Sequence, residues 1–104
     1  MTELTGKQKR FLRAKANRLK PVFSVGKNGL SKLWLTEINK ALDNRELIKI
    51  SIQKNADLDS DDVKSYIEND GQILVVQTIG KNLVLFKPSK DEDKQNISKQ
   101  VFDI

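Results

Sequence analysis

The sequence predicts an α/β fold, a four-stranded mixed sheet with three helices in the order α-β-α-β-α-β-β. Two periodicities support this prediction: apolar residues three or four positions apart indicate helices, and alternating apolar residues indicate strands. The expected helices cover residues 6–17, 30–42 and 60–70, and the expected strands cover 22–25, 46–53, 72–79 and 83–87. The first two strand–helix–strand steps are long enough for right-handed parallel crossovers, and the last two strands are close enough for a hairpin.

The first helix has a recognisable start. Thr5 and Gln8 match a capping box, in which each side chain satisfies a backbone N–H of the other residue. An apolar side is expected to contain Leu4, Phe11, Leu12, Ala16 and Leu19. Cations in the first turn lie near the positive end of the helix dipole, where each costs about 0.3–1 kcal/mol. Since this gains nothing for folding, it points to a functional face.

Pro21 precedes the first strand, and a glycine-containing loop leads from that strand into the second helix. The apolar stripe of this helix is expected to comprise Leu30, Leu33, Trp34, Ile38, Ala41 and Leu42. Trp34 is interpreted as a core residue. In strand 46–53, Ile48, Ile50 and Ile52 alternate with Lys49, Ser51 and Gln53, which indicates one buried face.

The third helix opens at Ser60-Asp61-Asp62 with acids near its dipole-positive end, and Gly71 closes it. Its apolar stripe includes Tyr66. Asp57, Asp59, Asp61 and Glu68 match four ligand positions of an EF-hand loop, but Asp62 stands where the turn needs glycine. We therefore expect a solvated acidic loop whose later acids cap the helix, and no metal.

Gly80-Lys81 suits a two-residue hairpin loop with glycine first. Phe86 is out of step with Leu83 and Leu85, so it either packs on the other face of the last strand or is partly exposed. Residues 1–89 are expected to form the domain, with residues 90–104 as a polar, flexible tail. The alternative for this tail is a short docking helix, because Ile97, Val101 and Ile104 lie four and three positions apart.

Composition narrows the function classes. The 104 residues contain no cysteine and no histidine, and no GxSxG or Walker-type motif occurs. Hydroxyl groups have no imidazole to activate them, so we expect a protein that is not an enzyme and has no cofactor. No stretch has the length of a membrane span or the character of a signal peptide. A soluble, cytoplasmic monomer is expected.

Charge is unevenly distributed. The net charge is +5, but residues 1–54 hold 13 basic and 4 acidic residues, against 6 and 10 in residues 55–104. Between Lys7 and Lys20 there are seven basic residues and no acidic residue. This stretch is either a solvated helix face or an anion-binding surface, and its lack of acids favours anion binding.

The loop Gly26-Lys27-Asn28-Gly29 is the strongest candidate site. Unpaired N–H groups at a helix start bind phosphate when the chain comes close, and glycines allow that approach. KH domains grip nucleic-acid backbones with such a GxxG loop. The alternative is an ordinary glycine-rich turn, but the basic stretch nearby favours phosphate.

These features together resemble the CRM domain family (chloroplast RNA splicing and ribosome maturation), especially its stand-alone bacterial YhbY-type members. The stretches concerned are LTGKQKRFLRAKANRLKPVFSVGKNGL, EINKAL, ELIKI, the helix ending before Gly71, and QTIGKNLVLFKPS. The resemblance covers residues 4–89 and implies a fold related to the C-terminal domain of bacterial initiation factor three. It also implies binding to precursor ribosomal RNA of the large subunit.

We therefore expect an RNA-binding protein of large-subunit assembly. The expected contacts are Gly26, Lys27, Asn28 and Gly29 of the loop, together with Lys9, Arg10, Arg13, Arg18, Lys20 and Lys32 around it and Lys81 at the hairpin tip. Three other functions remain open. One is a protein-interaction module that docks on ribosomal particles, and another is a nucleic-acid enzyme that uses lysine or a bound metal. The third is a general binder of single-stranded nucleic acid, DNA included.

Overall fold

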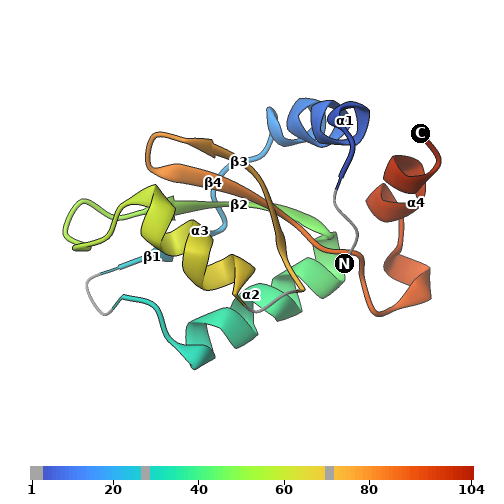
Figure 1. Cartoon of the computed structure of the whole chain (residues 1–104). Helices are drawn as coiled ribbons and strands as arrows, with labels where there is room; N and C mark the ends of the chain where they lie inside the picture. The colour runs from blue at the N-terminus through green and yellow to red at the C-terminus, as the bar shows by residue number, and fades with distance from the viewer. Residues whose placement is uncertain (1–3, 27–28, 70–71) are drawn as a thin grey trace.

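The computed structural model describes residues 4–26, 29–69 and 72–104. Its helices are α1 (Gly6–Ala16), α2 (Lys32–Arg45), α3 (Ser60–Glu68) and α4 (Ile97–Phe102), with a short 3-10 turn η1 (Glu92–Lys94). Its strands are β1 (Phe23–Val25), β2 (Leu47–Ile52), β3 (Leu74–Ile79) and β4 (Asn82–Phe86). The predicted α/β order is confirmed through β4, with element ends displaced by at most three residues (Figure 1).

The four strands form one mixed sheet in the order β1-β2-β4-β3. β1 pairs with β2 in parallel, so the β1–α2–β2 unit is the expected parallel crossover. β4 pairs antiparallel with both β2 and β3. The β3–β4 turn has two residues, because Ile79 pairs with Asn82, and Gly80 takes a φ of +57° as a glycine-first turn requires.

Helices cover both faces of the sheet, which makes three layers (Figure 1). α2 and α3 pack on one face, where Ile38, Leu42, Val63 and Ile67 meet the isoleucines of β2. α1 and α4 pack on the other face, where Leu12 and Ala16 meet Val84 and Phe86. β4 is therefore buried on both sides, and Phe86 is fully buried, packed against the α1 side.

Both predicted helix caps are present. The Thr5 hydroxyl accepts from the Gln8 N–H (3.2 Å), and the Gln8 side chain accepts from the Thr5 N–H (2.9 Å). Asp59 and Asp62 form the equivalent pair at the start of α3. The acidic segment thus caps a helix, and the described residues contain no group of acids gathered as for a metal ion. None of the helices seen in these ranges is long and apolar enough to cross a membrane.

The expectation of a flexible tail after residue 89 was wrong for the segment that forms η1 and α4. Val101 is fully buried and Ile97 packs beside it in the α1-side cluster. The ring of Phe102 meets that of Phe86 edge-on, at 6.1 Å between centroids. The short docking helix is the correct alternative, because Ile97 and Val101 complete the face of the sheet that α1 leaves open. Ile104 does not take part, since it follows the helix and is 51% exposed.

Glu46 joins this last segment to the sheet. It ends α2 in the left-handed region, at φ +65°, and is only 1% exposed. Its carboxylate accepts hydrogen bonds from the N–H groups of Ser89 (2.8 Å), Asn96 (2.8 Å) and Ser98 (3.1 Å). Its backbone carbonyl accepts from the Lys87 N–H at 2.9 Å. One residue therefore closes α2, aligns the end of β4 and holds the C-terminal segment.

The protonation of two carboxylates is linked to this junction. Burial by itself would raise the pKa of Glu46, but the Ser98 side chain beside it and the backbone N–H donors of Ser89, Ser98 and Asn96 lower the pKa overall. The Ser98 hydroxyl contributes without reaching normal hydrogen-bond geometry. The pKa of Asp43 is also lowered: its partial burial is outweighed by Lys87, whose ammonium lies 3.1 Å from the carboxylate, and by the Lys90 N–H.

Replacing Glu46 by glutamine is expected to destabilise the fold by about 1–3 kcal/mol, because an amide NH₂ cannot accept from the backbone donors now held. Urea unfolding followed by circular dichroism measures this change. Glu68→Gln is the matched control: its carboxylate is about half exposed and 3.9 Å from Lys64, so its effect should stay within about 0.5 kcal/mol. Equal effects of the two substitutions would contradict the role of Glu46.

Stability is also expected to fall in acid. A carboxylate with a lowered folded-state pKa stabilises the fold fully above its unfolded-state pKa of about 4.3, and this stabilisation is lost as the pH falls through the lower folded-state value. Unfolding free energies of wild type and Glu46→Gln should therefore draw closer as the pH falls from 7 to below about 4.3. Parallel curves would show that Glu46 does not carry this pH dependence.

Candidate nucleic-acid interface

Three loops meet at one edge of the sheet, where β1 and β2 end. The Ile52 N–H donates to the carbonyl of Lys81 in the β3–β4 turn (2.8 Å), and the Gln53 N–H donates to the carbonyl of Val25 at the end of β1 (2.9 Å). Figure 1 shows the end of β1, the β2–α3 loop and the β3–β4 turn at the same end of the molecule. Lys81 is thereby brought to the edge that carries the two loop glycines.

The two glycines of the loop differ in backbone conformation. Gly29 has a φ of +72°, and its N–H donates to the Gly26 carbonyl at 2.9 Å. A Cβ on Gly29 would find nearly open space, whereas one on Gly26 would lie 3.1 Å from the Gln53 side-chain oxygen. Lys27 and Asn28 lie outside the described residues. Gly29 is thus required by its backbone angle, and its surroundings leave room for an approaching ligand.

The start of α2 follows immediately and is firmly placed. The Ser31 hydroxyl accepts from the Trp34 N–H (3.1 Å), and the Trp34 indole N–H donates to the Ser24 carbonyl of β1 (3.2 Å). Trp34 is half-buried against the core, as expected. Lys32 is exposed in the first turn of α2, which contains no acid. Its positive charge therefore adds to the partial positive charge of the helix dipole at this end.

The expected apolar stripe of α2 was wrong at Leu33, which is 71% exposed. Leu30 precedes the helix but packs against the core, as its apolar side chain predicted. The helix begins at Lys32 because Ser31 caps it, and this start turns Leu33 outward. An exposed leucine therefore stands next to Lys32 at this edge.

The cations of α1 form a second group. Lys9, Arg10 and Arg13 are exposed, and α1 packs against β2, β3 and α4, on the face of the sheet opposite α2. Lys9 and Arg13 line a shallow groove with Lys64 and residues of β3. The expected arrangement of all these cations around the glycine loop is therefore incorrect for α1, because the sheet separates them (Figure 1).

Arg18 and Lys20 lie between these two groups. They are exposed in the linker that leads from α1 to β1. Each described residue of the predicted basic set is free of ion pairs with the acids that the structure describes. The result is a discontinuous basic surface that runs from α1 through the linker to the loop edge.

Two nearby cations were not included in the prediction. Lys54 is exposed directly after Gln53, whose side-chain amide donates to the Ser24 hydroxyl at 3.0 Å. Lys49 is half-buried in β2 on the α1 side of the sheet. The alternation of the β2 sequence placed Lys49 on the polar face, but only the parallel pairing of β1 with β2 brings Lys54 beside the loop.

The difference between the two glycines gives a stability test. Gly29→Ala is expected to destabilise the protein by about 1–3 kcal/mol, because a side chain at φ +72° is strained. Gly26→Ala should cost less than about 1 kcal/mol, because the new methyl group would meet only the movable end of Gln53. Thermal unfolding of both variants measures the difference, and a larger loss of stability for Gly26→Ala would contradict this description of the loop.

A family model and two similar proteins agree on one family. The model of the CRS1 / YhbY (CRM) domain matches residues 4–87. The Probable RNA-binding protein YqeI of Bacillus subtilis is 49% identical over 92 residues, which are 88% of this chain and 95% of that protein. A Haemophilus influenzae protein named RNA-binding protein is 41% identical over 92 residues, which are 88% of this chain and 92% of that protein.

A solved structure is similar as well. The hypothetical protein SAV1595 of Staphylococcus aureus, described as a candidate RNA-binding protein, superposes with a TM-score of 0.71 at 34% identity. The match covers 90% of this chain and 98% of that one. Sequence and fold thus agree, and the chain belongs to the CRS1 / YhbY (CRM) domain family.

Proposed function

We propose that this protein binds RNA at the edge of the sheet formed by the Gly26–Gly29 loop. The observation that supports this most strongly is the convergence there of a positive-φ glycine, a helix start with no acid, and the exposed cations Lys32 and Lys81. Such an edge offers backbone N–H donors and positive charge to the same phosphate. The names of the relatives, which are RNA-binding proteins, agree with this role.

In this proposal Gly26 and Gly29 allow the RNA backbone to approach, and Lys27 and Asn28 contact phosphate or sugar. The cations of α1 and the linker add attraction that does not depend on RNA sequence. They extend the binding surface beyond the loop, around the side of the sheet. Binding, without catalysis, is the whole of the proposed activity.

The proposed target is precursor ribosomal RNA of the large subunit, and the proposed role is in assembly of that subunit. The resemblance to stand-alone bacterial CRM proteins supports this choice. The positive surface also fits a target whose backbone is exposed and densely charged. Its specificity would come from RNA shape or from a few base contacts.

The loop is tested by Lys27→Asp/Asn28→Asp, which adds negative charge where phosphate is expected. Binding to large-subunit ribosomal RNA fragments should fall about tenfold or more at 150 mM salt, and the salt slope should shrink by about 0.7 for each phosphate that is no longer neutralised. Lys99→Asp/Gln100→Asp on exposed positions of α4 makes the same charge change and is the control. Circular dichroism verifies that both variants fold.

Equal binding by the loop variant and its control would contradict the loop assignment. Competition with a DNA of the same sequence distinguishes an RNA-binding protein from a general binder of single strands. If the protein stays on ribosomal particles after nuclease treatment, the protein-interaction module is the better description.

A further inference from the structure

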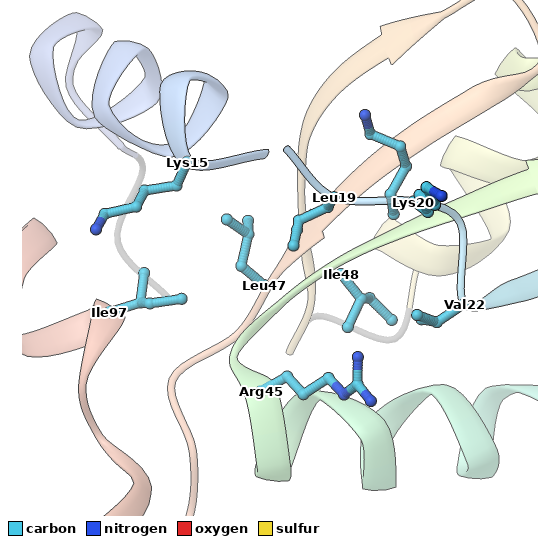
Figure 2. Close-up of a pocket in the computed structure, with 9 residues that line it drawn as sticks. Lys15, Leu19, Lys20, Val22, Arg45, Leu47, Ile48 and Ile97 are labelled. Atoms are coloured by element: carbon cyan, nitrogen blue, oxygen red, sulfur yellow. The ribbon is translucent and has the colours of Figure 1, made fainter. Parts of the chain in front are cut away.

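A hollow of ≈ 480 Å³ lies beside the α1–β1 linker, away from the glycine loop. Its floor is apolar and comes from three parts of the chain: Leu19 and Val22 of the linker, Leu47 and Ile48 of β2, and Ile97 of α4. Figure 2 shows Leu19 and Leu47 facing each other there, with the Arg45 side chain extending toward Ile48 and Val22. The sequence did not predict this hollow, because one of its sides is formed by α4, in a segment that was expected to be a flexible tail.

The remaining residues that line the hollow are all cations, Lys15, Lys20, Arg45 and Lys49. No acidic residue lines it, and none of the four pairs with an acid in the part of the chain that the structure describes. Lys15 lies 5.5 Å from the Phe11 ring centroid, and Arg45 lies in the last turn of α2, so both have some structural use. Lys49 has no such use, since it lies over no aromatic ring among the described residues and does not stand at a helix end.

Lys49 is the most informative of the four. It is half-buried in a central strand, opposite Val84 in the sheet register, although a β2 residue on this face would normally be apolar beneath a helix. Its side chain is partly buried in the sheet face, and no acid in the described part of the chain pairs with its ammonium group. An anionic ligand in the hollow would supply the missing partner.

We infer that this hollow is a second RNA subsite, which takes one unpaired nucleotide. The base would lie on the apolar floor beside the Arg45 guanidinium plane, and the phosphates would lie among the surrounding lysines. A nucleotide has both the flat apolar part and the adjacent negative charge that this lining complements. The inference rests on the proposed function, since the nucleotide belongs to the same bound RNA.

The distance between the two sites is compatible with a single strand. Val22 lies in the floor and Gly26 opens the loop four residues later. At about 3.3 Å per extended residue this is roughly 13 Å. That length corresponds to about four stacked nucleotide steps of about 3.4 Å. RNA gripped at the loop can therefore run along the edge strand β1 and place an unstacked base in the hollow.

The test uses the full chain and a large-subunit ribosomal RNA fragment that contains 4-thiouridine. Arg45→Gln/Lys49→Gln should weaken binding about tenfold at 150 mM salt and reduce the salt slope by about 1.4, as expected for two phosphates. Lys40→Gln/Lys99→Gln removes the same charge from positions outside the hollow and should leave the slope unchanged. Thermal unfolding verifies that both double variants fold.

A third variant examines the base itself. Val22 is 43% exposed, so Val22→Asn should fold, lower affinity and leave the salt slope unchanged. Light-induced crosslinks from 4-thiouridine to peptides 19–22 and 47–49 are expected in wild type and should diminish in this variant.

The outcomes separate the two proposals. If wild type binds RNA but the Arg45/Lys49 variant binds as its control does, and crosslinks occur only near the glycine loop, the subsite is refuted and the proposed function stands. If wild type binds no RNA fragment, both are refuted. If RNA binding persists in the Lys27→Asp/Asn28→Asp variant and is abolished in the Arg45/Lys49 variant, the hollow is the principal site.

Discussion

The buried carboxylate of Glu46 is the constraint on which the arrangement of this protein depends. It accepts hydrogen bonds from three backbone N–H groups of the segment after β4. The backbone of Glu46 also ends α2 at a positive φ and aligns the end of β4. A left-handed conformation for a glutamate costs free energy, and the hydrogen bonds to the carboxylate offset it. Together with the packing of Val101 and Ile97, this junction fixes α4, which forms one side of the hollow beside the linker. A folding constraint therefore shapes a surface some distance away.

The two ends of α2 have separate anchors, and the glycine loop adjoins the anchor at the N-terminal end. At the C-terminal end, Glu46 fixes the helix against the sheet. At the N-terminal end, the Ser31 cap and the indole bond from Trp34 to Ser24 fix it against β1. The loop between β1 and α2 thus connects two elements whose positions are set independently of any ligand.

The two halves of the chain divide acids and bases by physical role. Acids of the second half serve folding: Asp59 and Asp62 cap α3, and Asp91 caps η1. The predicted basic surface of the first half makes no ion pairs with the described acids, and cations in the first turn of α1 oppose its dipole. Charges that do not stabilise the fold are most simply explained by a polyanionic partner. The half-buried Lys49 extends this reasoning from the helix to the interior of the sheet face.

Local patterns in the sequence determined the helix caps, the alternation of β2, the Gly80-Lys81 turn and the position of the glycine loop. These features follow from hydrogen bonds and side-chain spacing within a few residues, so they can be read without the rest of the chain. Only the tertiary structure decided which face α1 covers, that Lys81 and Lys54 reach the loop edge, that α4 docks, and that Glu46 is buried. Each of these depends on pairings between residues about 25 or more positions apart, whose free energy comes from packing and desolvation of the assembled sheet. No local window contains that information.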